Sequence, residues 1–226
     1  MPFDNISICA IVPVRSGSKR VINKNIRPFA GTSLLEIKIR QLLDVNFIDQ
    51  IYVSSDADEM LKIAVSKGCR ALKRPEHLAS DTVPMSEVYT HLAENVNEQI
   101  VVFTHVTNPL CPSSAYMRAI ETYFERSGIH DSLTTVSDVK DFLYLDGKPL
   151  NFDPGNKPRS QDLPDIIKLN HAISVASREL MISERNIFGK FPIHMRLSQK
   201  EALDIDTELD FFIAESLFKR IELSGK

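Results

Sequence analysis

Five cationic side chains follow a short apolar run near the start of the chain. Arg15, Lys19, Arg20, Lys24 and Arg27 gather in and just after IVPVRSGSKRVINKN, and no carboxylate occurs from residue 6 to residue 34. A glycine between two serines in this segment allows backbone N–H groups to approach a bound group closely. Backbone N–H groups together with cationic side chains suit a phosphate chain. On charge alone, the alternative is a solvated basic turn.

Two carboxylates, Asp204 and Asp206, stand close together far along the chain, in DIDTELDF. On an extended segment they would share one face, while the isoleucine between them points into the core. Carboxylates at this spacing offer oxygen ligands for Mg²⁺, which could bridge phosphates and offset developing charge. The alternative is that both acids simply precede a helix N-terminus, where acids are favourable.

The elements that must position these groups alternate between apolar strands and amphipathic helices. The Val/Ile-rich strands are typical of a parallel sheet that is covered on both faces. Repeated strand–helix units predict an α/β fold with a Rossmann-like, mostly parallel sheet. In such sheets ligands bind beyond the carboxyl ends of the strands, where the cationic segment lies. We expect strands over residues 6–14, 50–54, 99–105, 132–136, 166–175 and 193–197, and helices over 84–96, 113–127 and 207–221.

Two further helices and several helix ends are marked by local signals. Ser33–Glu36 has the form of a capping box that opens the first helix. Asp56 is expected to cap the second helix, and Gly68 to end it. Thr207–Asp210 is a capping pair for the final helix.

Residues 138–166 interrupt the strand–helix pattern. Asp146–Gly147 is a hairpin signal, and four prolines make the segment too irregular for a crossover helix. We therefore predict a single domain over 1–226, in which 138–166 form an inserted, β-rich arm. A two-stranded hairpin alone is marginal in water, so a partner subunit is expected to cover the apolar residues of the arm in a homodimer.

The composition excludes several classes of protein. With 226 residues, 43% hydrophobic, 25% charged and a net charge of -3, the chain reads as globular and not as a general nucleic-acid binder. No apolar run approaches the ~20 residues that span a bilayer. The early Asp4 argues against a signal peptide. Three scattered cysteines, Cys9, Cys69 and Cys111, suit reduced thiols, so we expect a cytoplasmic protein with no membrane or nucleic-acid partner.

Taken as whole motifs, both charged segments resemble one family. RSGSKR followed by KN is similar to the R-x-G-S-K-R…K-N signature of the sugar-activating cytidylyltransferases, which include the CMP-sialate, CMP-legionaminate and CMP-pseudaminate synthetases. DIDTELDF resembles the DIDTExD segment that carries the metal aspartates of this family. The resemblance implies that the loop binds CTP, with Arg15, Lys24 and Asp206 as catalytic residues. It also implies nucleotide contacts from Ser18, Lys19 and Asn25, and Mg²⁺ held by Asp204 and Asp206.

Three weaker matches lie in the expected order between these motifs. KRPEHLASDT (73–82) resembles a nucleotide-facing loop, which adds Arg74, Asp81 and Thr82 to the nucleotide site. THVTNPL (104–110) resembles the acceptor-side Q-P-T-S-P-L-R, and PRSQDLP (158–164) resembles R-R-Q-D-L-P in the arm that the family exchanges between subunits. The acceptor-binding residues implied in this way are His105, Thr107, Asn108, Arg159, Gln161, Lys168, Asn170 and His171.

The departures from the family pattern cluster on the acceptor side. His105 stands where a glutamine is usual, and Cys111 where Arg or Lys is usual. The family's R-P-N-G-A-I-Y becomes KLNHAIS, so that Lys168, His171 and Ser174 replace Arg, Gly and Tyr. A carboxylate-binding Arg and an aromatic wall are expected parts of a sugar-acid pocket. We therefore expect the family's chemistry with an altered acceptor.

The sequence thus predicts Mg²⁺-dependent transfer of CMP from CTP to a sialic-acid-like 2-keto sugar acid, with release of pyrophosphate. The acceptor oxygen would attack the α-phosphorus in line, without a covalent enzyme intermediate. One alternative is a nucleotidyltransferase for another nucleotide or a non-sugar hydroxylated acceptor. A second is an inactive nucleotide-binding subunit. A glycosyltransferase is less favoured, because its metal-binding DxD usually follows a central strand.

Overall fold

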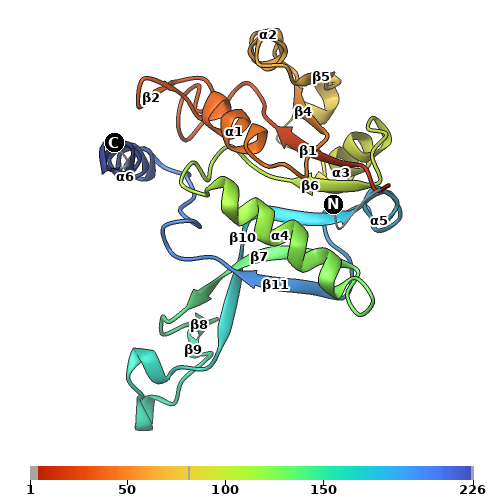
Figure 1. Ribbon diagram of the computed structural model, residues 1–226. Helices are drawn as coiled ribbons and strands as arrows, with labels where there is room; N and C mark the ends of the chain where they lie inside the picture. The colour runs from red at the N-terminus through yellow and green to blue at the C-terminus, as the bar shows by residue number, and fades with distance from the viewer. Residues whose placement is uncertain (1–4, 81, 225–226) are drawn as a thin grey trace.

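A seven-stranded sheet forms the centre of the protein in the computed structural model, which describes residues 5–80 and 82–224 (Figure 1). Its strands are β1 (Ile8–Pro13), β4 (Gln50–Ser55), β5 (Arg70–Lys73), β6 (Ile100–Phe103), β7 (Ser132–Val139), β10 (Ile166–Ser177) and β11 (Pro192–Arg196). The strand order is β11-β7-β10-β6-β1-β4-β5. All neighbouring strands are parallel except β10, which runs antiparallel to both β6 and β7. The predicted α/β fold with a mostly parallel sheet is confirmed.

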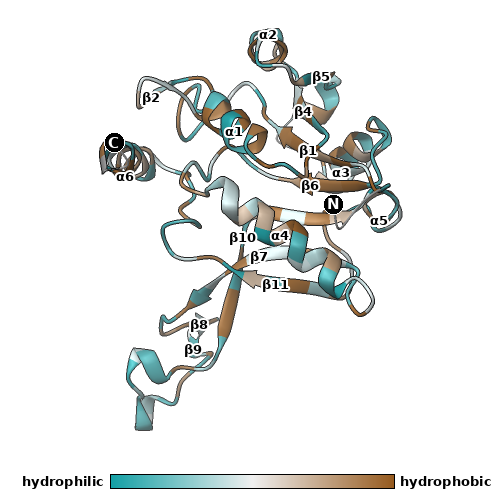
Figure 2. Ribbon diagram, in the orientation of Figure 1, coloured by the Kyte–Doolittle hydropathy of each residue, from teal (hydrophilic) through white to brown (hydrophobic). Residues whose placement is uncertain are grey.

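Helices cover both faces of this sheet. They are α1 (Leu34–Leu43), α2 (Asp58–Ser66), α3 (Met85–Glu94), α4 (Ser113–Arg126), α5 (Arg178–Glu184) and α6 (Glu208–Ser224). Successive residues of β1 point to opposite faces, so Ile8 and Ala10 pack with α1, α4 and α6, whereas Cys9 and Ile11 pack with α3 and α5. Figure 2 shows the resulting apolar central strands between helices that are polar on their outer sides.

Short elements complete the fold. Two residue pairs, β2 (Pro28–Phe29) and β3 (Thr32–Ser33), form a small ribbon ahead of α1. Single 3₁₀ turns cover Glu76–Ala79, Pro154–Asn156 and Ser160–Asp162. In the part of the chain that the structure describes, no helix combines the length and apolar character that crossing a bilayer requires.

The predicted capping pairs at α1 and α6 are confirmed. Ser33 Oγ accepts from the backbone N–H of Glu36 at 3.3 Å and donates to the Glu36 carboxylate at 2.9 Å. At α6, the Asp210 N–H donates to Thr207 Oγ1 at 3.2 Å, and the Thr207 N–H donates to the Asp210 carboxylate at 2.7 Å. These contacts satisfy N–H groups that a helix start otherwise leaves without acceptors.

The prediction for the start of α2 is wrong, although that for its end is correct. Ala57 occupies the N-cap, with no side-chain cap, and Asp56 lies one residue before it. The Asp56 carboxylate accepts instead from the backbone N–H of Ser16 at 2.9 Å and from the Ser16 hydroxyl. Asp56 therefore fixes the cationic loop after β1, because the fold brings a backbone N–H and a hydroxyl of Ser16 within reach of its carboxylate. Gly68, with φ +82°, follows α2 and donates to Val65 at 3.0 Å.

The segment 138–166 projects from the sheet as an arm (Figure 1). Its hairpin consists of β8 (Tyr144–Leu145) and β9 (Lys148–Pro149), joined by Asp146 and Gly147 with φ of 50° and 76°. Positive φ at both positions is what a tight two-residue hairpin turn requires. Phe142 and Phe152 stack edge to face with centroids 4.9 Å apart, whereas Tyr144 and Leu145 are 61% and 60% exposed. The arm therefore covers only part of its own apolar surface.

Candidate functional site

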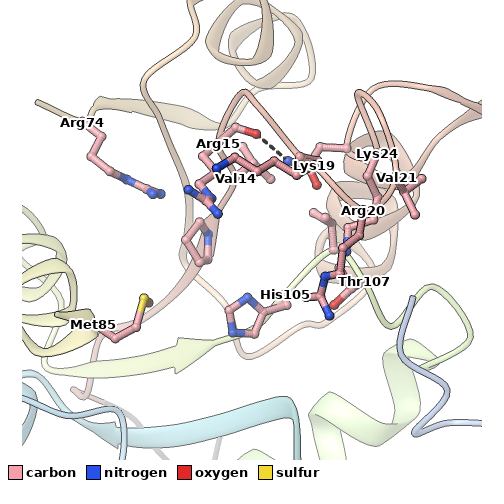
Figure 3. Close-up of a pocket in the computed structure, with 14 residues that line it drawn as sticks. Val14, Arg15, Lys19, Arg20, Val21, Lys24, Arg74, Met85, His105 and Thr107 are labelled. Atoms are coloured by element: carbon pink, nitrogen blue, oxygen red, sulfur yellow. Dashed lines mark hydrogen bonds between the residues drawn. The ribbon is translucent and has the colours of Figure 1, made fainter. Parts of the chain in front are cut away.

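A cavity of about 260 Å³ opens at the carboxyl ends of β1 and β6 (Figure 3). In Figure 3, His105 and Thr107 lie across the cavity from Arg15 and Lys19. The lining combines an apolar floor with cationic groups. It comprises Pro13, Val14, Arg15, Ser18, Lys19, Arg20, Val21, Lys24, Asn25, Arg74, Met85, His105, Val106 and Thr107.

Eight residues that the sequence assigned to nucleotide or acceptor binding meet in this cavity. They are Arg15, Ser18, Lys19, Lys24, Asn25, Arg74, His105 and Thr107. Sequence reasoning missed two polar or flexible lining residues, Arg20 and Met85. Arg20 belongs to the cationic segment already singled out, so its charge was a usable signal. Met85 gave no comparable signal, because in the sequence it is an ordinary apolar residue at the start of a helix, α3.

The loop after β1 is fixed by its own buried polar group. Asn25 is 6% exposed, and its Nδ2 donates to the backbone carbonyl of Arg15 at 2.9 Å (dashed in Figure 3). The Arg15 guanidinium reaches across to the Ala79 carbonyl at 3.1 Å, which ties the loop to the segment after β5. Asn25 thus supports the loop from behind while Arg15 borders the cavity.

Arg74 is a buried cation at the side of the cavity. It is 5% exposed, and its guanidinium donates to the Ser54 carbonyl at 3.0 Å and to the Ser54 hydroxyl at 3.3 Å. Burial lowers the pKa of Arg74, and the Asp56 carboxylate partly offsets this. A cation held in this way, without a direct carboxylate partner among these bonds, is suited to an anionic ligand.

The carboxylate segment is joined to the rim of the cavity. The Ile205 N–H donates to the Thr107 carbonyl at 2.9 Å, and the Thr107 hydroxyl donates to the Asp204 carboxylate. Lys24 Nζ donates to the Ile205 carbonyl at 2.5 Å. Ile205 is fully buried, as the alternating pattern predicts. The segment therefore runs directly beside the cationic loop.

Charges in this segment affect one another. The pKa of Asp204 is raised, first because surrounding atoms desolvate its carboxylate and then because Asp206 is near, even though part of the residue remains exposed. Burial lowers the pKa of Lys24, and the two aspartates oppose that shift. Arg20 pairs with Asp206 at 2.8 Å. The cations of the loop and the carboxylates of this segment are thus electrostatically coupled.

The donor set fits a magnesium ion that arrives with a ligand. Among residues 5–80 and 82–224, no group of three or more His, Cys, Asp or Glu side chains could hold a metal. Asp204 and Asp206 would supply carboxylate oxygens, the ligand type that Mg²⁺ prefers, and the ion would need further ligands from elsewhere.

A bulge in β10 carries two residues, Asn170 and His171, that the sequence assigned to acceptor binding. The register with β7 shifts between Leu169 and Ser174, and His171 takes φ +53° inside the bulge. Asn170 is buried: its Oδ1 accepts from Thr135 at 2.6 Å, and its Nδ2 donates to Ser137 at 3.0 Å. Asn170 thus holds the bulge together, and His171 is exposed beside it.

His105 is half-buried at the cavity wall, edge-on to Phe103 with ring centroids 5.3 Å apart. Burial, with the charges of His171 and Lys38 next in importance, lowers the pKa of His105 to about 4. The imidazole is therefore neutral near pH 7, and one ring nitrogen is a hydrogen-bond acceptor. Ser174, in the position of the family's tyrosine, is 1% exposed and bonds to Thr134 at 3.1 Å inside the sheet.

The structure does not bring every predicted residue to this cavity. Arg159 pairs with Asp162 at 3.0 Å in the arm, and Gln161 is exposed next to them. Lys168 is exposed on β10, and Thr82 is exposed after the 3₁₀ turn. Asn108 lies just behind the wall, 1% exposed, with its Nδ2 on the Leu203 carbonyl at 3.3 Å. Asp81 lies outside the described residues.

Comparison with known proteins gives a consistent result. The model of a protein family described as cytidylyltransferase matches residues 9–214. The chain is 30% identical over 233 residues to post-translational flagellin modification protein B of Campylobacter coli, with 97% of each chain covered. It is 27% identical over 220 residues to pseudaminic acid cytidylyltransferase of Campylobacter jejuni (serotype O:2), covering 92% of this chain and 95% of that one.

Longer relatives and a solved structure extend this comparison. N-acylneuraminate cytidylyltransferase A of Danio rerio is 25% identical over 228 residues, which are 97% of this chain but 52% of that protein, so the chain spans about half the relative's length. A structure described as CMP:2-keto-3-deoxy-manno-octonic acid synthetase complexed with CTP superimposes with a TM-score of 0.72 at 12% identity, covering 95% of this chain and 99% of that chain. The last likeness concerns the fold alone.

Proposed function

The chain belongs to the cytidylyltransferase family and is thus a nucleotidyltransferase, and from this premise we propose that it transfers CMP from CTP to a sialic-acid-like 2-keto sugar acid, releasing pyrophosphate. One observation carries the proposal: a cationic cavity at the carboxyl ends of β1 and β6 has two carboxylates tied to its rim through Thr107. That pairing of charges suits a triphosphate with its metal ion.

The nucleotide half of the reaction uses the loop after β1. Arg15 and Lys24 bind the phosphates and stabilise the charge that develops on them during transfer. Ser18 and Lys19 line the same space, and Arg74 adds a positive charge at its side. Asn25 acts indirectly, because its amide holds the Arg15 backbone in place. Thr82 and Asp81 complete this group in our proposal.

We assign Asp204 and Asp206 as the residues that hold Mg²⁺. When bound, the ion supplies charge neutralisation on the transferring phosphoryl group. The chain's own contribution is to orient both carboxylates: Thr107 fixes Asp204, and the Lys24–Ile205 contact fixes the backbone between them. Arg20 is released from Asp206 when the phosphates compete for it.

The acceptor half lies toward β6 and the β10 bulge. His105 and Thr107 border the cavity, and Asn108, Lys168, Asn170 and His171 belong to the same region. Arg159 and Gln161 sit in the arm, so they serve the acceptor site of the partner in a homodimer. Two matched relatives carry names that refer to sialic-type acids, N-acylneuraminate and pseudaminic acid, which supports this acceptor class.

Two other readings remain open to test. A different nucleotide or a non-sugar hydroxylated acceptor would fit the altered acceptor residues, and an inactive binding subunit would keep only the nucleotide site. A thermal-shift panel of nucleoside triphosphates should give the largest stabilisation with CTP. Pyrophosphate release with CTP, Mg²⁺ and a mixed pool of sugar acids would exclude the inactive subunit.

The three cysteines are free and buried, in keeping with the cytoplasmic location that we propose.

A further inference from the structure

Lys38 is a buried cation behind the acceptor side of the cavity. It lies on α1, is 0% exposed, and donates from Nζ to the Asn108 carbonyl at 3.1 Å and to the Tyr116 hydroxyl at 2.5 Å. Among the residues that the structure describes, no carboxylate forms an ion pair with it. Lysine is almost never fully buried unless it is paired, and an apolar residue would fill this position at lower cost. The burial of this charge therefore needs a reason, and we look for it in the groups to which the ammonium donates hydrogen bonds.

The Tyr116 hydroxyl continues into a chain of hydrogen bonds. It lies 2.9 Å from Thr104 Oγ1, which in turn donates to the Ala172 carbonyl at 2.7 Å. An ammonium can only donate, and the shorter of the two carbonyl contacts of the Thr104 hydroxyl is to Ala172, at 2.7 Å against 3.4 Å for His105, so we take Thr104 as donor to Ala172 and Tyr116 as donor to Thr104. The relay therefore has one direction, from Lys38 through Tyr116 and Thr104 to Ala172.

The last two members of this relay each adjoin a histidine that the sequence assigned to acceptor binding. Thr104 immediately precedes His105, and Ala172 immediately follows His171. His171 has φ +53°, a backbone conformation that residues other than glycine rarely adopt and that needs support from its surroundings. The Thr104–Ala172 bond joins the residue that follows β6 to the β10 bulge, next to both histidines.

We propose that Lys38, Tyr116 and Thr104 are positioning residues that set the spacing of His105 and His171 and thereby determine affinity for the acceptor. They act from inside the protein and touch neither acceptor nor nucleotide. This inference rests on the proposed function for the identity of the substrate. The inference goes beyond the proposed function because it assigns part of acceptor selection to a buried hydrogen-bond network that does not line the cavity.

The sharpest test compares two substitutions at one buried position. Thr104→Val keeps the shape of the side chain but removes the hydroxyl, whereas Thr104→Ser keeps the hydroxyl. Losing this link removes one hydrogen bond from the Tyr116 hydroxyl, which keeps its bond from Lys38, and one from the Ala172 carbonyl. We expect Thr104→Val to raise KM for the best sugar acid about 10-fold, with KM for CTP unchanged within about 2-fold. Thr104→Ser should restore the wild-type value.

A second pair of variants probes the middle of the relay. Tyr116→Phe removes the connecting hydroxyl, and Tyr123→Phe makes the same change at a second buried tyrosine of α4. Tyr116→Phe should repeat the selective rise in acceptor KM, and Tyr123→Phe should not. The proposal is overturned if Thr104→Ser behaves like Thr104→Val, or if the KM values for acceptor and CTP rise together.

A spectroscopic readout separates this inference from the proposed function. If wild-type protein releases no pyrophosphate with any sugar acid, the proposed function fails, and the relay is judged by the imidazole NMR signals of His105 and His171. Both signals should shift in Thr104→Val and stay in place in Thr104→Ser and Tyr123→Phe. Unchanged signals in Thr104→Val would refute the relay whether or not the enzyme is active.

Discussion

The guanidinium of Arg20 lies 2.8 Å from the carboxylate of Asp206, and this ion pair joins the loop after β1 to the segment that precedes α6. The two side chains are 70% and 48% exposed, so the pair contributes about 1 kcal/mol or less to stability. Such a weak pair is easily exchanged for a phosphate or a metal ion. It brings residues from the two ends of the chain to one cavity rim, where the proposed chemistry takes place.

Replacing Asp206 by Asn should nearly abolish turnover while leaving CTP binding partly intact. The substitution keeps the size of the side chain but removes a charge that would hold the metal ion, whose effect on the transition state is worth several kcal/mol. Turnover and CTP affinity are to be measured at limiting Mg²⁺. Glu208→Gln, which removes a nearby charge paired with Arg27, is the control. Normal turnover of Asp206→Asn at limiting Mg²⁺ would remove this residue from the mechanism.

Arg15→Ala should impair the nucleotide step equally for every acceptor. Loss of one charge-assisted contact costs about 1.5–3 kcal/mol, which is roughly 10–100-fold in kcat/KM. Lys24→Ala should have a similar effect, because both cations line the cavity. The comparison is Arg126→Ala, at the exposed end of α4. If Arg15→Ala retained both CTP affinity and turnover, the loop would be an ordinary basic turn.

The arm should hold two subunits together. Tyr144, Leu145 and Leu150 are 61%, 60% and 55% exposed, which leaves an apolar surface that a hairpin cannot cover by itself. We predict a dimer in analytical ultracentrifugation, and a shift toward monomer for Leu145→Glu. Lys148→Glu changes charge in the same hairpin without removing apolar surface and serves as the control. A stable, active wild-type monomer at micromolar concentration would show that the arm has another role.

The stability of the protein should rise with pH above neutrality because of Lys38. Burial lowers the pKa of Lys38 from 10.5 to about 8. Between these values the unfolded chain binds the proton and the folded chain releases it, so folding is favoured as pH rises, and the cost of the buried charge is largest below about pH 8. Relative to Lys38→Met, the wild type should gain about 2 kcal/mol in free energy of unfolding from about pH 7 to about pH 10. The free energies of unfolding are to be measured by urea titration at each pH. If they changed with pH in the same way for both proteins, a charged, buried Lys38 would be contradicted.

Local patterns predicted much of the fold and the nucleotide side of the site. Ser33, Gly68 and the Asp146–Gly147 turn are short-range signals, and each has the expected role. The meeting of the cationic loop with the carboxylate segment follows from a general rule, since both adjoin the carboxyl ends of parallel strands.

The features that sequence could not supply depend on long-range contacts. Apolar periodicity does not encode strand direction, so the antiparallel entry of β10 between β6 and β7 was not foreseen. Asp56 does not cap α2 but accepts from Ser16, a residue that is distant in the sequence and close only in the folded chain. Lys38 reads as one polar residue in an amphipathic helix, and its burial depends on Tyr116 and Asn108 from distant parts of the chain.

The most direct test of the account is pyrophosphate release by wild-type protein with CTP, Mg²⁺ and a panel of 2-keto sugar acids that includes N-acetylneuraminate. We predict Mg²⁺-dependent release with CTP, and a higher kcat/KM for another acid of the panel than for N-acetylneuraminate. The reason is that His105, at the cavity wall, and His171, in the β10 bulge, differ from the family pattern, and a pocket that leaves polar groups unpaired can reject an analogue by a factor of about 10⁴. No release with any acid would contradict the proposed reaction. N-acetylneuraminate as the best acceptor would contradict the claim that the family's chemistry is here joined to an altered acceptor site.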